Sequence, residues 1–115
     1  MNTIRLVEIA HARSGDKGNH SNIGVVAYTA AGFEHLRQLL TPEWIAERFK
    51  SLGVTRVDRF ELPKIHAFNF LLYDALAGGA SRSLRIDTQG KLLSTALLDM
   101  TIDEPANLAA MRPSA

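Results

Sequence analysis

Residues 12–22 read ARSGDKGNHSN, and residues 23–29 follow at once with IGVVAYT. The second segment is rich in β-branched residues, which predicts a strand. Thr3–Ala10, ahead of the polar run, is rich in Ile, Leu and Val and predicts another strand. The polar run is too long for a tight hairpin turn, so we expect it to form a loop between the two strands.

The middle of the chain predicts two helices and a third strand. Apolar residues at helical spacing cover Phe33–Leu40. Thr41-Pro42-Glu43 is typical of a new helix start, because Thr caps, Pro suits the first helical position and Glu favours the positive end of the helix dipole. Gly53 is a natural end to this second helix. Val54–Leu62 then alternates at its end and predicts a strand.

The last third predicts a further helix and a terminal hairpin. Lys64–Ala77 carries apolar residues at helical spacing. Ser83–Asp87 and Leu92–Ile102 flank a turn and predict paired strands. Helices set among a few strands favour the α+β class, and the simplest candidate is a ferredoxin-like α/β sandwich: a mostly antiparallel sheet with helices on one face. We expect one domain over residues 1–103 and a loosely packed or disordered tail over residues 104–115.

Composition narrows the classes of function. The chain is 46 % hydrophobic and 22 % charged, which is ordinary for a globular protein. It has no cysteine, which excludes disulfides, thiolate metal sites and cysteine nucleophiles. A net charge of +1 without a basic run argues against a nucleic-acid partner. No apolar run is long enough to span a membrane, and the first residues do not resemble a signal peptide, so we expect a cytoplasmic protein.

The polar run holds groups that suit an anion. Gly15 and Gly18 allow backbone N–H groups to converge on a negative charge. Arg13 can grip a carboxylate or phosphate through two parallel hydrogen bonds, and Lys17 adds a point charge. Asp16 can act as a general base or hold the two cations in place. The alternative is a solvated connection in which these residues do only turn chemistry.

Other interpretations of the same region are weaker. His11, Asp16 and His20 offer metal ligands, but their spacing does not enforce convergence. Ser14 or Ser21 with these groups superficially supplies a hydrolase triad, but no G-x-S-x-G elbow is present. We therefore expect neither a metal nor a cofactor. Further along the chain, Asn69 stands between two phenylalanines and either turns towards the polar run or bonds a neighbouring backbone group.

The run RSGDKGN at residues 13–19, followed by NIGV at residues 22–25, resembles the signature of the AtuA-like ferredoxin-fold domain. A second matching block runs in pieces from Leu62 to Lys91, so the resemblance covers about residues 3–102. This domain is the C-terminal part of acyclic terpene utilisation proteins of the AtuA type and also occurs free-standing. The resemblance implies a ferredoxin-like fold and a role in the degradation of branched or terpenoid acyl compounds as coenzyme A thioesters. It also implies a small subunit that acts with a separate large AtuA-type subunit.

These arguments give one leading hypothesis and two alternatives. The leading one is an accessory subunit or domain that binds an anionic small molecule, such as an acyl-CoA, or completes a partner's site. The first alternative is a self-sufficient, homo-oligomeric small enzyme with Asp16 and Lys17 as catalytic residues beside Arg13, and the second is a regulatory ligand-binding module. Whether the chain is an enzyme stays open. The residues expected to bind the ligand are Arg13, Ser14, Gly15, Gly18, Asn19, Asn22 and Asn69.

Overall fold

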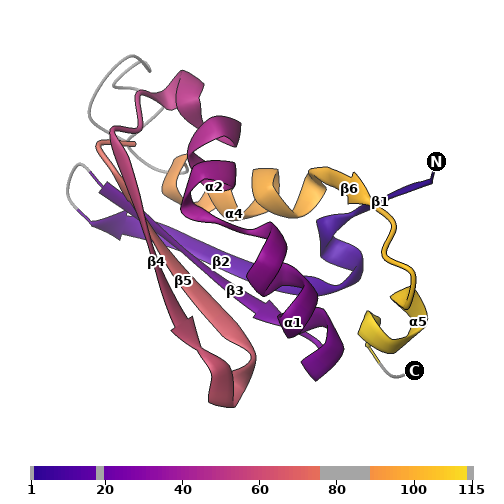
Figure 1. Ribbon diagram of the computed structural model, residues 1–115. Helices are drawn as coiled ribbons and strands as arrows, with labels where there is room; N and C mark the ends of the chain where they lie inside the picture. Colours follow the sequence, from indigo (N-terminus) through magenta and orange to yellow (C-terminus); the bar gives the residue numbers. More distant parts are fainter. Residues whose placement is uncertain (1, 18–19, 76–88, 114–115) are drawn as a thin grey trace.

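A four-stranded antiparallel sheet forms the centre of the computed structural model, which describes residues 2–17, 20–75 and 89–113 (Figure 1). Its strand order is β2-β3-β5-β4. The strands are β2 (Ala10–Lys17), β3 (His20–Ala27), β4 (Arg56–Leu62) and β5 (Ala67–Tyr73). A separate two-stranded ribbon pairs β1 (Thr3–Arg5) with β6 (Thr101–Asp103) and so joins the two ends of the domain.

Three helices of the described part of the chain cover one face of the sheet: α1 (Ala30–Leu39) lies against β3, α2 (Pro42–Arg48) against β4, and α4 (Gln89–Asp99) against β2. Thr29 and Thr41 cap the first two, and each side chain accepts a 3.0 Å hydrogen bond from the backbone N–H of the third residue of its helix. The remaining elements are short: the 3-10 turns η1 (Leu6–Glu8), η2 (Lys50–Leu52) and η3 (Pro63–Ile65), and the helix α5 (Leu108–Met111).

The hydrophobic core fills the space between these helices and the sheet. Alternate residues of β3 and β5 point inward, and Phe33 of α1 stacks on Phe68 of β5 with ring centroids 4.8 Å apart. Each large apolar side chain that is fully buried contributes roughly 1.5–3 kcal/mol of transfer free energy. The core side chains with no exposed surface include Leu6, Ile23, Val25, Leu36, Leu40, Ile45, Phe68, Phe70, Leu72 and Leu97.

The α+β class and the ferredoxin-like arrangement of one antiparallel sheet with helices on one face are confirmed. The predicted helices over residues 33–40 and 42–52 correspond to α1, α2 and η2, and the predicted third strand to β4. Gly53 ends the second helical segment with a φ of 81°, a left-handed conformation that favours glycine.

The predicted helix over residues 64–77 is wrong, because Ala67–Tyr73 forms the strand β5. The apolar residues of this segment fit both periods. Phe68, Phe70 and Leu72 alternate, and all three are buried against the helices. The strand lies between β3 and β4, where cross-strand pairing on both sides decides its conformation.

The N-terminal strand and the polar loop also differ from the prediction. A 3-10 turn, η1, divides Thr3–Ala10 into β1 and the first residue of β2. The polar run is no open loop: β2 and β3 stay paired until Lys17 faces His20. Ladder hydrogen bonds therefore hold most of the run, and its residues alternate between the two faces of the sheet.

The predicted terminal hairpin is wrong in its second half, and Ser83–Asp87 lies outside the described residues. Residues 89–99 form α4, with Leu93 and Leu97 buried one helical turn apart, and β6 pairs with β1 instead. The tail, for which we expected loose packing, forms α5 and buries Met111 in the core. No helix within the described ranges has the length and apolar character needed to cross a membrane.

Candidate functional site

The face of the sheet opposite the helices brings together four predicted ligand residues, which are Arg13, Gly15, Asn22 and Asn69. Strand register places Arg13 opposite Gly24, and Asn69 next to Gly24 on the far side, so the three form one row. In the neighbouring row, Gly15 lies opposite Asn22. Side chains in these rows share the open face, because directly opposed residues of a ladder point to the same side.

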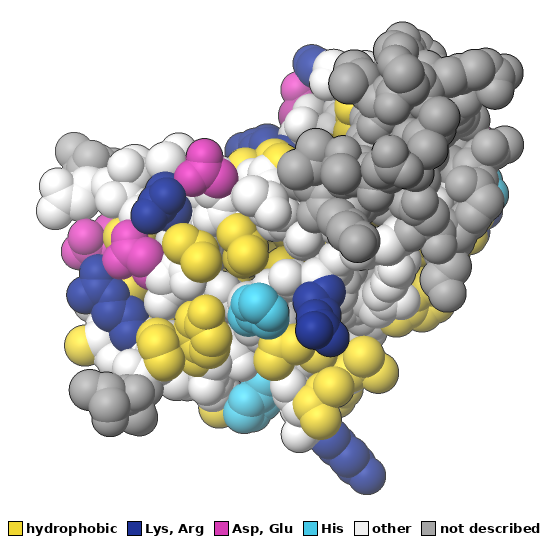
Figure 2. Space-filling view, turned by 180° about the vertical axis from the view of Figure 1, so that it is seen from behind, with side chains coloured by type: hydrophobic (Ala, Val, Ile, Leu, Met, Phe, Trp, Pro, Cys, Tyr) yellow, Lys and Arg dark blue, Asp and Glu magenta, His cyan; other side chains and the backbone are white. Residues whose placement is uncertain are grey.

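Arg13 is exposed at the edge of the sheet, and no carboxylate among the described residues pairs with it. His11, two residues earlier on the same strand face, is exposed as well. Figure 2 shows this side of the molecule, where basic and histidine side chains border hydrophobic ones. The guanidinium therefore keeps its donors for a group outside the described chain.

A hollow of about 580 Å³ lies along the outer edge of β2. Among the described strands, β2 ends the sheet and pairs with β3 alone. The hollow is wide and open, and its lining combines two basic or titratable side chains with two hydroxyl groups. The lining residues are His11, Ala12, Arg13, Ser14 and Ser94.

Asn22 and Asn69 form a pair in the middle of the open face. The Asn22 Nδ2 donates to the Asn69 Oδ1 at 2.7 Å, and both side chains are half-buried. Of the two orientations expected for Asn69, the structure shows the one towards the polar run. Each amide has hydrogen-bonding capacity beyond this one bond, since an Asn side chain carries two N–H donors and one acceptor oxygen.

The serines of the run face the helices instead. Ser14 Oγ accepts a 3.0 Å hydrogen bond from the backbone N–H of Ser94 in α4, and so links β2 to that helix. Ser21 is fully buried, and its Oγ donates to the Gly15 carbonyl at 3.1 Å. Ser14 thus reaches the edge hollow from the covered side, whereas Ser21 has a structural role within the hairpin.

Two glycines leave room on the open face next to Arg13. A Cβ atom built at Gly24 would meet the Arg13 carbonyl oxygen at 3.9 Å, and one built at Gly15 would meet Asn22 Oδ1 at 3.7 Å. Both are ordinary van der Waals distances, so the backbone itself does not demand glycine at either position. The missing side chains lower the surface between Arg13 and the Asn22–Asn69 pair.

A second polar cluster, which the sequence did not predict, lies at the other end of the hairpin. His20 Nδ1 accepts a 2.9 Å hydrogen bond from the backbone N–H of Asp74, and its ring centroid is 5.0 Å from that of Tyr73. Asp74 has a φ of 63°, which is uncommon for a residue other than glycine, and its Oδ2 accepts a 2.6 Å bond from Thr55 Oγ1. These residues come from three segments far apart in sequence, so no local sequence motif predicts the cluster.

Asp58 connects this cluster to β4. Arg56 donates two hydrogen bonds of 2.9 Å to its carboxylate, and the Tyr73 hydroxyl donates a third at 2.9 Å. The Arg56 bonds and then the Tyr73 bond lower the pKa of Asp58 below its ordinary value, since they stabilise the charged form. The same contact with Asp58 raises the pKa of Tyr73.

The structure leaves part of the predicted site without description. Asp16 and Lys17 lie in β2 opposite Ser21 and His20, and Gly18 and Asn19 fall outside the described residues. In the described parts of the chain, no group of three His, Asp or Glu side chains is arranged to hold a metal ion. The Nδ1 atom of His20 accepts the Asp74 N–H, so this ring nitrogen is not open to a metal ion.

Comparison with known proteins gives one match. The family model of the AtuA ferredoxin-like domain matches residues 4–103, which is most of the 115-residue chain. No curated protein and no solved structure matches. The matched range begins in β1, ends at the last residue of β6, and includes the whole sheet with the helices that cover it. The chain belongs to the AtuA ferredoxin-like domain family.

Proposed function

We propose that this chain is an accessory subunit or domain of an AtuA-type system and binds a small anionic ligand in the hollow at the edge of β2. The observation that carries the proposal is the exposed Arg13 in that hollow, without an ion-pair partner among the described residues. A guanidinium in a concave site suits a carboxylate or a phosphate, because its planar donors match both groups.

The surroundings of Arg13 support an anion of some size. His11 lines the same hollow, and its ring N–H can donate a further hydrogen bond to the ligand. Beyond Arg13, the lowered surface at Gly24 leads to the Asn22–Asn69 pair, whose amides can hydrogen-bond a polar ligand. Family membership favours an acyl-CoA of branched or terpenoid acid catabolism, since its phosphates and thioester offer the acceptors that these side chains need.

One end of the open face carries exposed apolar side chains, which supports an accessory role because a partner subunit could cover them. Val26 and Leu62 share a row with Ala67, and Phe60 ends the row that begins at Arg13. Val26, Phe60 and Leu62 are each at least 40 % exposed, which is high for large apolar side chains on one sheet face. We propose that a large AtuA-type subunit covers this end and so completes the site next to Arg13.

Calorimetric titration tests the ligand proposal with isovaleryl-CoA, coenzyme A and isovalerate as probes. We expect Arg13→Gln to weaken binding of the thioester by about tenfold or more, since hydrogen bonds to charged groups are worth about 1.5–3 kcal/mol. Arg37→Gln is the matched control, because it removes the same charge from helix α1 on the covered side. Equal loss in both variants, or no loss in either, contradicts the proposal.

Gly24→Val separates the open face from the edge hollow. The space at Gly24 and the high strand propensity of Val predict that the variant folds as well as the wild type. Weaker thioester binding in Gly24→Val places part of the ligand across the open face, whereas unchanged binding confines it to the hollow. Turnover of isovaleryl-CoA by the isolated chain, abolished by Asp16→Ala, would replace the accessory role with the self-sufficient enzyme.

Co-purification tests the partner proposal. We expect a co-expressed large AtuA-type subunit to be retained by the wild type and by Arg37→Gln, and to be lost with the double variant Phe60→Ser, Leu62→Ser. Light scattering of the chain alone checks the expected homo-oligomer. A large subunit that is retained equally by all three proteins would place the contact elsewhere.

A further inference from the structure

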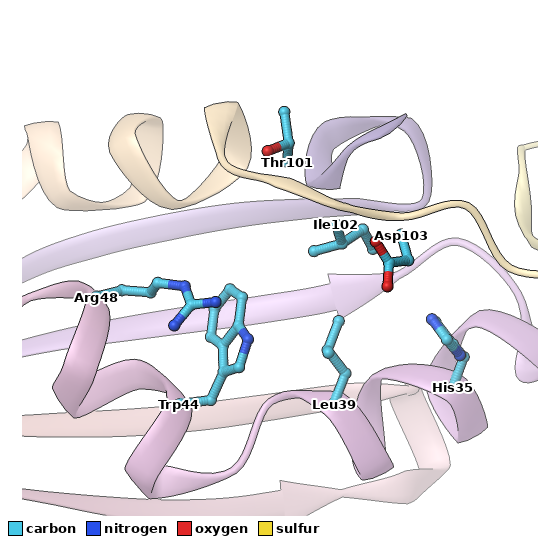
Figure 3. A pocket seen from close by; sticks show the side chains of 7 residues that line it. All are labelled: His35, Leu39, Trp44, Arg48, Thr101, Ile102 and Asp103. Carbon is cyan, nitrogen blue, oxygen red and sulfur yellow. The ribbon is translucent and has the colours of Figure 1, made fainter. Parts of the chain in front are cut away.

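A pocket of about 330 Å³ lies between the helix pair α1–α2 and strand β6, on the side of the molecule away from the open sheet face (Figure 3). None of the described residues that line it also lines the hollow at the edge of β2. Its volume is within the range of small-molecule sites. The residues that line it are His35, Leu39, Trp44, Arg48, Thr101, Ile102 and Asp103.

The middle of this pocket is apolar. Leu39 and Trp44 are half-buried, and Ile102 is only 6 % exposed. In Figure 3, Leu39 rises from α1 towards β6, and Ile102 points from β6 towards Trp44. These three side chains come from three different elements and offer a dry surface for the body of a ligand.

The positively charged side chain of Arg48 lies at one end of the pocket. The guanidinium carbon of Arg48 lies 4.2 Å from the centroid of the Trp44 ring, and no carboxylate among the described residues forms an ion pair with it. Stacking on the ring orients the guanidinium but leaves its N–H groups in their own plane for other acceptors. Arg48 is therefore positioned to receive a carboxylate at the end of the apolar surface.

The opposite end carries Asp103 and His35, and Figure 3 shows both side chains on the far side of Leu39 from Arg48. No described residue forms an ion pair with Asp103. Its negative charge repels a second carboxylate, so this end selects against dicarboxylates.

We propose that the pocket binds a short apolar monocarboxylate, with the carboxylate on Arg48 and the hydrocarbon body against Leu39, Trp44 and Ile102. Asp103 sets the preference for one carboxylate over two. The inference is independent of the proposed function, because no residue of the β2 edge takes part in it.

Trp44 makes the proposal directly measurable, because it is the single tryptophan of the chain. We expect hexanoate to change the tryptophan emission in a saturable way, with a dissociation constant on the order of 1 mM for a ligand of eight or so heavy atoms. Hexan-1-ol, which has the same body and no charge, binds at least about tenfold more weakly than hexanoate. Adipate, with a second carboxylate, binds at least about tenfold more weakly than hexanoate.

Three variants identify the residues responsible. Arg48→Gln weakens hexanoate binding by about tenfold or more, whereas Lys50→Gln, which removes the same charge two residues away and outside the pocket, changes it less than about twofold. Asp103→Asn raises the affinity for adipate and leaves that for hexanoate unchanged. Arg13→Gln does not alter the response, which separates this pocket from the β2 edge.

A different pattern of results overturns the inference. Lack of a saturable emission change at about ten times the expected dissociation constant rules out the pocket as a monocarboxylate site. Equal binding by Arg48→Gln and Lys50→Gln, or equal binding of hexanoate and hexan-1-ol, rules out recognition by Arg48. The indole N–H signal of Trp44 in NMR spectra, followed in the same titration, confirms that each variant is folded and that the change arises at the pocket.

Discussion

Asp58 accepts hydrogen bonds from Arg56 and from the Tyr73 hydroxyl, and these bonds act on its ionised form. Since they lower its pKa in the folded state, Asp58 contributes stability above the pKa that it has in the unfolded chain, about 3.9. This contribution is lost as the pH falls through the lowered folded-state pKa. We expect the melting temperature of Asp58→Asn to fall less steeply below about pH 4 than that of the wild type.

Tyr73→Phe is the companion variant, because it removes one of the hydrogen bonds to Asp58 and keeps the ring against His20. Its acid dependence should lie between those of the wild type and Asp58→Asn. The hydrogen bond of Tyr73 to Asp58 raises the pKa of the Tyr73 hydroxyl and so makes stability depend on pH in the alkaline range as well. The stability that this bond contributes is present below about pH 10 and is lost as the pH rises through the folded-state pKa of Tyr73. Identical melting curves of Asp58→Asn and wild type across pH 2–11 would contradict both expectations.

At the same scale, the sequence identified some of the candidate-site residues and missed others. Arg13, Asn22 and Asn69 could be predicted from an unusual local run and from an Asn between two aromatic residues. The contacts of His20 with Asp74 and of Tyr73 with Asp58 join residues 54 and 15 positions apart. They follow from the register of β3, β4 and β5, which no single segment encodes.

Among the elements, α2 has the clearest local start signal. Thr41 Oγ1 accepts a 3.0 Å hydrogen bond from the Trp44 N–H, and Pro42 takes the first helical position. We expect Thr41→Ala to lower the free energy of unfolding by about 1 kcal/mol, measured by urea denaturation, because one N–H of the first turn loses its partner. Thr41→Ser retains an acceptor oxygen and should lose much less. Equal losses in both variants would show that the methyl group of Thr41, not its cap, matters.

A contrast between α2 and β5 explains which elements the sequence could predict. Signals for α2 are chemical and local: a cap, a proline and a terminal glycine. The signal for β5 was apolar spacing alone, which fits a helix through Ile65, Phe68 and Leu72 and a strand through Phe68, Phe70 and Leu72. Its place between two other strands decides the matter, and that information is tertiary.

Over the whole molecule, the two ends of the domain close on each other. β1 pairs with β6, the backbone N–H of Glu104 donates to the Asn2 carbonyl at 3.1 Å, and Arg112 forms an ion pair with Glu8. Figure 1 shows both termini on the same side of the sheet. The pocket that Trp44 lines depends on this pairing of the two ends, because β6 supplies one of its walls. A substitution that weakens the packing of the C-terminal residues should therefore alter the pocket as well as the core.

Met111 is the residue on which this closure can be tested. It belongs to α5, packs near α1 and is only 3 % exposed. Met111→Ala should therefore leave a cavity and lower the free energy of unfolding by about 2–5 kcal/mol. Asn107→Ala, at an exposed position next to the same helix, should stay within about 0.5 kcal/mol of the wild type. Urea denaturation of the three proteins measures both values. If Met111→Ala unfolds at the same urea concentration as the wild type, the tail is loosely packed in solution and β1–β6 pairing alone closes the domain.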